Sequence, residues 1–418
     1  MRFALALLIA LTAFNSQAED FSFDLQAYQK KPYEFFGHAD LMTTHLQVDE
    51  NAALSRLSFR DQSPQDFQRY YGELELNGLY RFDNSLISFR GLGNYQHDTL
   101  QTLNDRTIQE LYWQLQPTTS WQFDIGKKAV KWGKGYAWNP VGFIERPKNP
   151  DDPEVNREGY VMLGSEWTHS LNGSIRNISG GLYALPISEA VNSDLDDSDT
   201  LLMAAKLSLL IDMTDLDFYL SRSSESKSSL GISFASNLSS NLEVHGDFVW
   251  REAVERPLLM DGVLQNRSDS EFQSLIGLRY LDSREITWIL EWLHQPQAYS
   301  TDEMRTFYQL AASEDLNDLQ LAQQARAAGY GLSNAGRNSL YLRASLKDWL
   351  DIVYLNAALT LFYNPEDHSS AVTPEWVYIP LKNHELRLRA GFLQGSRWSE
   401  YAEKLSDRKV ELRWRWYF

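Results

Sequence analysis

Charged, aromatic and proline residues gather between Lys131 and Glu158, and their types suit the control of a passage for solutes. Four of the chain's 13 prolines fall in this segment, and because proline fixes φ, the backbone should be stiff and extended. A stiff loop with both signs of charge can narrow a pore and select solutes by charge. We therefore predict an inward-folding constriction loop, with an ordered surface loop as the alternative. The candidate residues are Lys131, Lys134, Trp138, Arg146, Lys148, Asp151, Asp152 and Glu154.

A second group of charged residues alternates along segments near the two ends of the chain. If these segments are neighbouring strands, with Asp40 or its neighbours on a strand between them, a basic wall meets an acidic wall. Such walls set a transverse field that orders charged solutes. Alternatively, the charges pair with each other and solvate the wall. The predicted pore-lining residues are Glu73, Glu75, Arg90, Arg387, Arg389, Arg413 and Arg415.

Residue types and motifs argue against most other kinds of chemistry. The chain has no cysteine, which excludes disulfides, thiolate metal sites and iron–sulfur clusters. It has no G-x-S-x-G, H-E-x-x-H or Walker motif, and its eight histidines show no metal-ligand spacing. The net charge of −17 argues against nucleic-acid binding. We expect no enzymatic activity, cofactor, metal or nucleic-acid partner; a Ser/His pair hidden near His245 or His294 is the catalytic alternative.

The elements that carry these residues have a period of two. At the C-terminus, apolar Val410, Leu412, Trp414, Trp416 and Phe418 alternate with polar or charged residues, and similar patterns recur at 72–82, 87–95, 111–115, 121–125, 161–167, 201–211, 242–250, 286–292 and 386–392. Each such strand has one apolar and one polar face. In a soluble sandwich the apolar face would pack on a second sheet, whereas in a transmembrane barrel it meets lipid and the polar face lines a lumen.

The connections between these strands favour the barrel. About nine long polar segments alternate with about eight short turns, and this sorting by length is typical of outer-membrane barrels. Beyond the N-terminus, no run of about 18 apolar residues exists, so a helical membrane bundle is excluded. The predicted fold is all-β: a transmembrane, antiparallel, up-and-down β-barrel of about 18 strands, with short periplasmic turns and long extracellular loops.

The chain divides into three expected parts. Residues 1–18 have the pattern of a signal peptide, with a basic residue, an apolar stretch and a small-residue cleavage site. Residues 19–34 should form a short periplasmic segment, too short for a globular plug, and 35–418 the barrel in the bacterial outer membrane. Within the barrel, Ser300 and Glu303 form a capping-box pattern, and a second helix start follows at Ser313. A helical loop over 301–329 would either lid the pore or project from the surface.

Aromatic residues are frequent for so polar a chain, at 13 Trp, 21 Tyr and 20 Phe. Trp and Tyr favour the membrane interface, so two girdles are expected, in contact with outer-membrane lipid and lipopolysaccharide. Phe418, on the lipid-facing register, resembles the C-terminal signature that the barrel assembly machinery reads, and this machinery is an expected partner. The candidate girdle residues are Tyr70, Tyr80, Trp121, Trp167, Trp250, Tyr280, Trp349, Tyr363 and Trp398.

One strand-to-loop junction resembles a known family. It comprises Gln109–Trp113, then Asp124–Gly135, then Trp138-Asn139-Pro140. The glycine, the basic residues, the W-G-x-G run and the N-P pair look like those of a widespread, largely uncharacterised family of porin-like bacterial outer-membrane proteins. That family is distantly similar to the alginate-export porins. The resemblance implies a channel and names no solute.

These expectations combine into a predicted function. The barrel would be a porin-like channel, through which hydrophilic small-molecule or polymer solutes diffuse passively past the Pro-rich loop. Two alternatives remain open: a transporter of hydrophobic compounds, and a sealed structural or enzymatic barrel.

Overall fold

The computed structural model describes residues 31–60, 64, 66–98, 101–150, 152, 155–195, 199–223, 227–260, 262–332 and 334–418. The expected signal peptide and most of the expected periplasmic segment lie outside these residues. The first strand, β1 (Tyr33–Val48), starts slightly before the expected beginning of the barrel at residue 35. Among the described residues, no helix is both long and apolar enough to cross a membrane.

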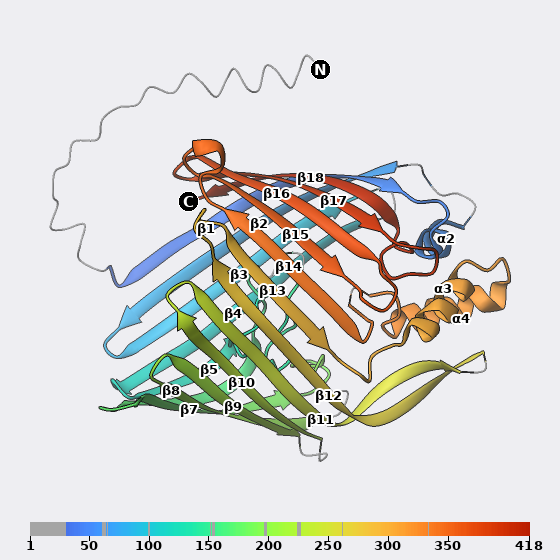
Figure 1. Ribbon diagram of the computed structural model, residues 1–418. Coiled ribbons are helices and arrows are strands. Elements are labelled where there is room, and N and C mark those ends of the chain that lie inside the picture. The colour runs from blue at the N-terminus through green and yellow to red at the C-terminus, as the bar shows by residue number, and fades with distance from the viewer. Residues whose placement is uncertain are drawn as a thin grey trace.

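Eighteen strands among the described residues form one antiparallel sheet that closes on itself (Figure 1). Neighbours in sequence are neighbours in the sheet, and β1 pairs with both β2 and β18, so the strand ladder has no open edge. Closure is what a sheet in lipid requires, because an open edge would leave backbone groups unpaired. The prediction of an all-β, up-and-down barrel is confirmed. The other strands are β2 (Asp66–Phe82), β3 (Ser85–His97), β4 (Thr102–Thr118), β5 (Trp121–Lys128), β6 (Tyr160–Ser170), β7 (Ile175–Ile187), β8 (Thr200–Ile211), β9 (Thr214–Ser223), β10 (Ser228–Ser239), β11 (Leu242–Met260), β12 (Val263–Leu281), β13 (Thr287–His294), β14 (Asn338–Leu346), β15 (Leu355–Tyr363), β16 (Ser370–Leu381), β17 (His384–Gln394) and β18 (Ser406–Tyr417).

The alternating pattern places apolar side chains outside and charged ones inside. On β18, Leu412 and Trp414 are 50% and 40% exposed, whereas Arg413 between them is 8% exposed. Leu41 of β1 lies opposite Trp414 and is also exposed, so the apolar face continues across the point of closure. An apolar outer band of this kind faces the hydrocarbon core of a membrane.

The connections fall into two groups, one at each end of the barrel. Between the described strands, eight connections lie at the end where β2 meets β3, here called the turn end, and nine at the opposite end, called the loop end. The predicted sorting by length holds only in part. The loop-end connections at 98–101, 224–227 and 261–262 are as short as turns. In particular, β11 and β12 stay paired through the polar segment 252–270, past a bulge between Arg251 and Val254.

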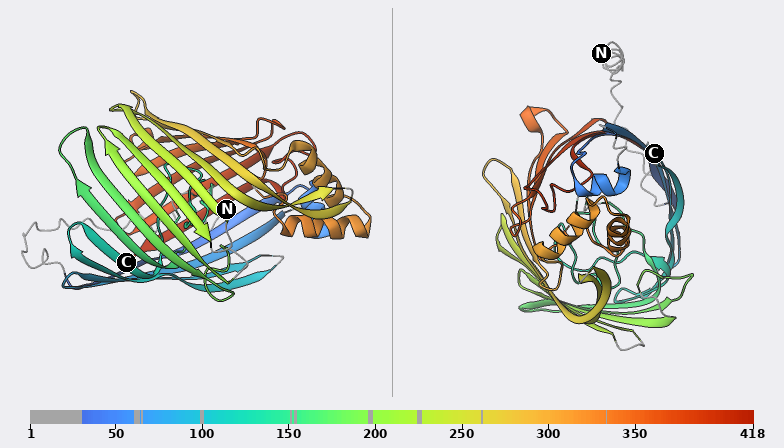
Figure 2. Two further views of the ribbon diagram at one scale, coloured as in Figure 1. Left: turned by 90° about the horizontal axis from the view of Figure 1, so that it is seen from below. Right: turned by 90° about the vertical axis from the view of Figure 1, so that its right-hand side faces the viewer.

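Three helices lie at the loop end, within the outline of the barrel when it is viewed end-on (Figure 2, right). They are α2 (Ala53–Phe59), α3 (Thr301–Ala311) and α4 (Leu316–Ala327); a short 3₁₀ helix, η3 (Trp349–Asp351), lies at the turn end. The predicted capping box is confirmed, because Ser300 and Glu303 bond each other's backbone at the start of α3. Asp315, rather than Ser313, caps α4.

The loop-end helices share an apolar core, and we call this assembly the cap. Phe307 and Tyr308 of α3, Ala322 of α4 and Tyr330 are fully buried together. The segment 395–405 closes the cap, because the Glu403 carboxylate accepts a 2.6 Å hydrogen bond from the Ala53 amide of α2. The cap therefore joins three connections that are distant in sequence, and its helices follow from tertiary packing.

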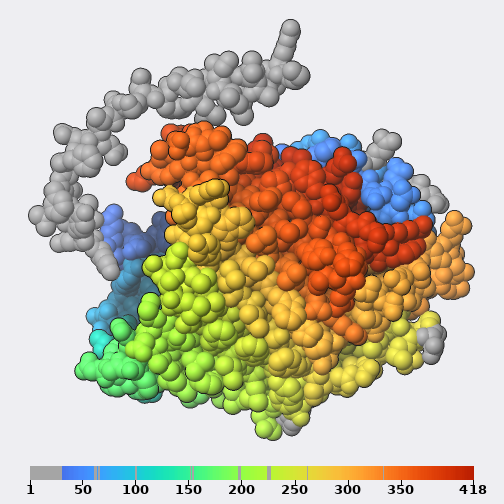
Figure 3. Space-filling view, viewed as in Figure 1, coloured from blue at the N-terminus to red at the C-terminus, as the bar shows by residue number. Residues whose placement is uncertain are grey.

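Aromatic residues face outward near both ends of the strands. Tyr80 and Trp121 lie near the turn end, and Tyr70 and Trp250 toward the loop end; all are more than a third exposed. The outer wall is a continuous surface on the face shown in Figure 3.

Trp398 does not belong to a girdle, because it packs against the core of the cap. It lies in an irregular connection, where alternation gives no orientation.

Candidate functional site

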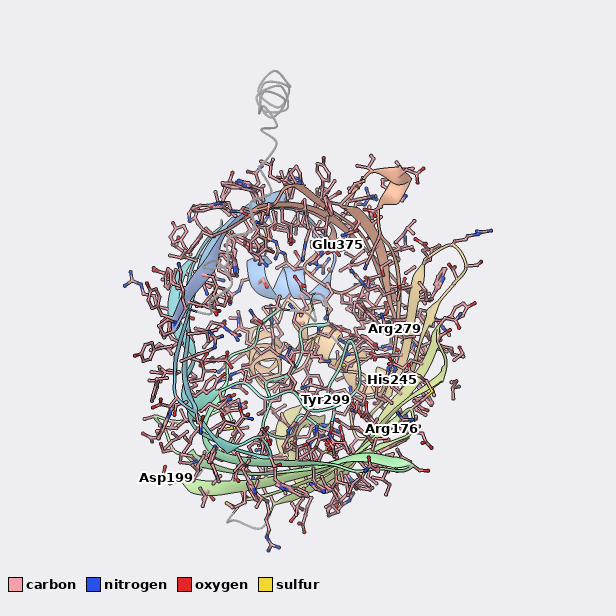
Figure 4. The ribbon with its side chains drawn as sticks, turned by 90° about the vertical axis from the view of Figure 1, so that its left-hand side faces the viewer. Arg176, Asp199, His245, Arg279, Tyr299 and Glu375 are labelled. Atoms are coloured by element: carbon pink, nitrogen blue, oxygen red, sulfur yellow. The ribbon has the colours of Figure 1, made fainter. Side chains whose placement is uncertain are left out.

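The connection between β5 and β6, residues 129–159, folds into the barrel, and we call it the internal loop. Figure 4, viewed from the turn end, shows its trace crossing the interior between walls that carry Glu375 and His245. It contacts side chains on β9, β11, β13 and β17, which lie on different sides of the barrel. The internal loop therefore occupies the middle of the lumen.

Backbone amides within and just after the W-G-x-G run bind to two carboxylates of the wall. The amide of Lys134 donates to Asp247 of β11 at 3.0 Å. The amides of Tyr136 and Ala137 donate to the two oxygens of Glu291 on β13, at 2.5 and 2.8 Å. Both carboxylates are fully buried. Leaving a buried carboxylate without hydrogen-bond partners would be costly, so these contacts fix the loop to the wall.

Gly133 is required for this arrangement. Its φ is +89°, and a Cβ atom there would lie 2.8 Å from Asp247 Oδ2 and 2.9 Å from Val141. A side chain would therefore meet both an unfavourable backbone conformation and a clash. The Gly133 amide donates to the hydroxyl of Tyr219 on β9, at 3.2 Å.

His245 belongs to the same anchoring group. Its Nε2 lies 2.8 Å from Glu291, and its ring packs edge-on against Tyr136. His245, Asp247 and Glu291 stand on the lumen side of their strands, but the internal loop covers all three and they are fully buried. Sequence reasoning missed their role because alternation places residues on a face but does not show what covers them.

Other candidate residues of the internal loop also contact the wall. Lys134 Nζ pairs with Asp217 of β9 at 3.1 Å. Trp138 packs against Tyr341 of β14 and Phe362 of β15. Arg146 instead binds Asp194, in the connection between β7 and β8, at 2.5 Å.

Burial shifts the pKa values of two charged groups inside the internal loop away from their ordinary values. Burial raises the pKa of Glu145, whose carboxylate accepts a 2.8 Å hydrogen bond from the Trp132 amide and pairs with Arg157. Burial lowers the pKa of Lys148, whose ammonium donates to the carbonyl of Gly135. Both side chains fold the loop onto itself. Lys131 differs, because it is exposed and lines a polar cavity.

Asp152 extends from the internal loop to the basic wall. Its carboxylate lies 2.8 Å from Arg387 of β17 and 3.7 and 3.8 Å from Arg389 and Arg413. The neighbouring candidates Asp151 and Glu154 lie outside the described residues. Asn156 reaches another wall and donates to Glu75 of β2 at 3.4 Å.

The predicted basic and acidic walls adjoin, with Asp40 of β1 between them. Arg415 binds both oxygens of Asp40, at 2.6 and 2.7 Å. Similar pairs form on the basic wall between Arg413 and Glu385 and between Arg389 and Glu375, and Arg90 of β3 pairs with Glu110 of β4. Glu73 accepts a hydrogen bond from Tyr71 and lies 3.3 Å from His38.

Among the described residues, one group of side chains brings possible metal ligands close together. Donor atoms of His38, Asp40 and Glu73 lie within 4.8 Å of one another. Both oxygens of Asp40 already accept hydrogen bonds from Arg415. The arginine therefore supplies the positive charge that a metal ion would bring.

Two of the polar cavities beside the internal loop meet at Asp152. The larger is about 670 Å³ and is lined by Lys131, Arg90, Arg343, Glu375 and loop residues. The smaller is about 220 Å³ and is lined by Glu73, Glu75, Arg413 and Arg415. Asp152, Val155, Asn156 and Arg387 line both cavities, so the loop tip separates them.

No protein-family model and no curated protein sequence matches the chain. Solved structures do resemble it. Wzi of Escherichia coli, described as an outer-membrane protein involved in group 1 capsule assembly and a carbohydrate-binding β-barrel, has a TM-score of 0.54 at 10% identity, over 91% of this chain and 83% of that one.

Two further solved structures give similar values. For OccK5 (OpdH) of Pseudomonas aeruginosa the TM-score is 0.51 at 10% identity, over 92% of this chain and 98% of that one. For OccAB1 of Acinetobacter baumannii the TM-score is 0.51 at 12% identity, over 94% of this chain and 99% of that one. Identities this low show the fold alone. With its closed sheet and apolar outer band, the chain is a β-barrel of the bacterial outer membrane.

Proposed function

We propose that this barrel is a passive channel for hydrophilic solutes and that the internal loop narrows it. One observation carries the proposal: buried carboxylates of the wall hold the internal loop in place, and charged cavities remain beside it. The anchors are Asp247 and Glu291, and the larger cavity is lined by Arg90, Arg343 and Glu375. A fixed loop beside a charged wall gives a defined aperture and selection by charge.

Planar-bilayer recording of the purified protein tests the proposal. Stable single-channel conductance is the expected result, with ion selectivity that changes when a cavity-lining charge such as Lys131 is replaced by Gln. A barrel that inserts and stays silent would contradict the channel. Deleting Pro140–Pro153 is expected to raise conductance, and unchanged conductance and selectivity would contradict the role of the loop.

Two contacts outside the lumen belong to the same proposal. The exposed apolar band meets outer-membrane lipid, and the loop end meets lipopolysaccharide. Phe418 is 39% exposed on the outward register, where the barrel assembly machinery could bind it. Replacing Phe418 by Ser should slow insertion in cells more than refolding of the purified protein. An equal effect on both would contradict recognition by the machinery.

A carbohydrate-binding barrel with a sealed lumen is a second candidate. The cap favours it, because α2, α3 and α4 lie across the loop end and share a buried core. Wzi, which has a similar fold, is described as carbohydrate-binding. A silent barrel that retains bacterial polysaccharide on a column would favour this function over the channel.

We propose no catalytic role. His245 contacts Glu291 and Tyr136, and His294 contacts Asn338, so among the described residues both serve structural contacts. A hydrolase would need a nucleophile within hydrogen-bond reach of its base.

A further inference from the structure

We propose that Arg387, Arg389 and Arg413 form a binding site for a carboxylate group of the permeating solute. In this structure Asp152 of the internal loop occupies the site as an internal substitute. We call the three arginines the arginine triad. The inference rests on the proposed channel function and adds to it the chemical class of solute: small hydrophilic molecules that carry a carboxylate.

The distances support the role of Asp152 as the ligand of the triad. Its Oδ2 atom lies 2.8 Å from Arg387 Nη1, 3.7 Å from Arg389 Nη2 and 3.8 Å from Arg413 Nη1. One carboxylate oxygen thus faces three guanidinium groups from β17 and β18. Planar guanidinium groups suit carboxylates because their N–H donors match the two oxygens.

Arg387 depends on Asp152 more than the other two arginines do. Among the described residues, its other ion-pair contacts are with Glu375 and Glu385, both at 3.8 Å. Arg389 keeps a close pair with Glu375 at 2.7 Å, and Arg413 keeps Glu385 at 3.4 Å. If Asp152 left, Arg387 would lack a close partner, and a partly buried cation without a partner is costly.

Two nitrogen atoms of the triad have no hydrogen-bond partner, which also supports a site for a solute. The Nε atoms of Arg387 and Arg413 are buried and have no hydrogen-bond partner. Arg413 is only 8% exposed. One aspartate on a short side chain therefore does not satisfy the triad. A solute with a carboxylate and neighbouring hydroxyl groups could contact more of it.

The place of the site fits a solute on its way through the barrel. Asp152 and Arg387 line both the cavity of about 670 Å³ and the one of about 220 Å³. The larger cavity lies within the range of about 300–1,000 Å³ that is typical of small-molecule sites. Displacement of Asp152 would join the two cavities, so binding and passage would be coupled.

Exchange of one carboxylate for another leaves the charge of the site unchanged. Asp152 is tethered, so it competes as an intramolecular ligand with an effective concentration on the order of millimolar. The site should therefore bind a free carboxylate weakly. Weak binding suits a channel, because a solute must also leave.

Calorimetric titration of the purified barrel in detergent tests the site without requiring conduction. The probe is glucuronate, and glucose serves as the neutral analogue with the same ring. Asp152→Asn removes the internal competitor, so the dissociation constant for glucuronate should fall about tenfold. Arg387→Gln should abolish binding, whereas Arg387→Lys should restore part of it. Glucose should not bind to any variant.

Two variants separate displacement from a general change of charge. Asp152→Glu keeps the tethered carboxylate and should bind glucuronate like the wild type. Glu34→Gln removes one negative charge beside Arg81 near the turn end. Glu34 lies eight residues along β1 from Met42, which pairs with Arg413, so this change should also leave the affinity unchanged. If Glu34→Gln tightens binding as much as Asp152→Asn, the effect is general electrostatics and the proposal is wrong.

The remaining outcomes are equally decisive. Binding of inorganic phosphate but not glucuronate would overturn the carboxylate assignment. In bilayers, glucuronate should block the ion current at about tenfold lower concentration in Asp152→Asn than in the wild type. A barrel that conducts, with glucuronate affinity unchanged by Asp152→Asn, would overturn the site but keep the channel. A barrel that binds glucuronate at the triad but never conducts would keep the site and overturn the channel.

Discussion

At the scale of single residues, buried carboxylates of the wall act as acceptors for the backbone of the internal loop. Asp247 and Glu291 accept three amides from the segment around Gly135, and Glu145 accepts a fourth within the loop. A buried carboxylate is costly unless it is hydrogen-bonded, and an irregular loop has amides without strand partners. Each group therefore satisfies the other, which explains why acidic residues stand on the lumen side at these positions.

The first prediction concerns Gly133. Gly133→Ala should weaken attachment of the internal loop by about 1–3 kcal/mol, because a φ of +89° is unfavourable for alanine and its Cβ would contact Asp247. The rate of proteolytic cleavage within residues 129–159 measures this loss of attachment, and cleavage should be faster in Gly133→Ala than in the wild type. Gly93→Ala is the matched control, because a Cβ at Gly93 would have no neighbour within 4 Å. Equal cleavage of the two variants would contradict the role of Gly133.

The second prediction concerns Glu400 in the cap. Burial raises the pKa of Glu400 above its ordinary value of 4.5. The folded cap therefore binds a proton in a pH range where the unfolded segment has lost it, so stability should fall as pH rises from 4.5 through the folded pKa. A tenfold difference in proton affinity between the folded and unfolded carboxyl group corresponds to about 1.4 kcal/mol of stability.

Hydrogen exchange of the Asn334 amide, which donates to Glu400 at 2.6 Å, reports this effect. After correction for the intrinsic dependence of exchange on pH, protection should decrease across that window in the wild type. Glu400→Gln should flatten the dependence. Protection that increases with pH would show that the sign is wrong.

At the scale of elements, the cap is assembled from connections that lack an internal core of their own. α3 buries Met304, Phe307, Tyr308 and Ala311 against α2, α4 and the extended hairpin of β11 and β12. Short helices are marginal alone, so their stability comes from this packing and from their ends. The Leu259 amide donates to the Tyr330 hydroxyl at 3.0 Å, which ties the hairpin to the cap.

The third prediction concerns the start of α3. Ser300→Ala removes the side-chain acceptor for the Glu303 amide and should destabilise the cap by about 1 kcal/mol. Hydrogen exchange in α3 should then become about fivefold faster, while the barrel strands stay protected. Gln309→Ala, on the exposed side of the same helix, should not accelerate exchange. Acceleration by both variants would indicate that the capping box is not the cause.

At the scale of the whole molecule, closure and burial by lipid decide stability. The strand ladder satisfies backbone groups all around the barrel, and the outward apolar residues are exposed until a membrane covers them. Inside, the internal loop and the charged wall replace the packed core of a soluble protein. Mean hydropathy is −0.42 because the average combines an apolar outside, a polar inside and polar connections.

The fourth prediction tests which surface faces lipid. Leu412→Arg places a charge on the outward face of β18 and should destabilise the barrel in vesicles by about 2–4 kcal/mol. Leu316→Arg is the control: Leu316 is 68% exposed on the cap, where water replaces lipid. Denaturant titration of both variants refolded in vesicles measures the difference. Equal destabilisation would contradict the assignment of the lipid-facing surface.

The barrel itself could be predicted from the sequence, because strand alternation is a local property. A period of two places Arg413 and Trp414 on opposite faces whatever the neighbouring strands are. The number of strands followed from the connections, and the helix start at Ser300 followed from a pattern four residues long. The position of Asp40 between Glu73 and Arg415 also followed, because neighbouring strands pair in sequence order.

Only the tertiary structure decided what lies inside the barrel. The contacts of Asp152 with Arg387 and of Lys134 with Asp247 join residues 235 and 113 positions apart in the chain. Such contacts leave no periodic signal, because an irregular loop takes its path from the walls that satisfy its amides and charges. Alternation therefore determined which residues face the lumen, and the folded internal loop decided which of them are buried anchors and which remain open to a solute.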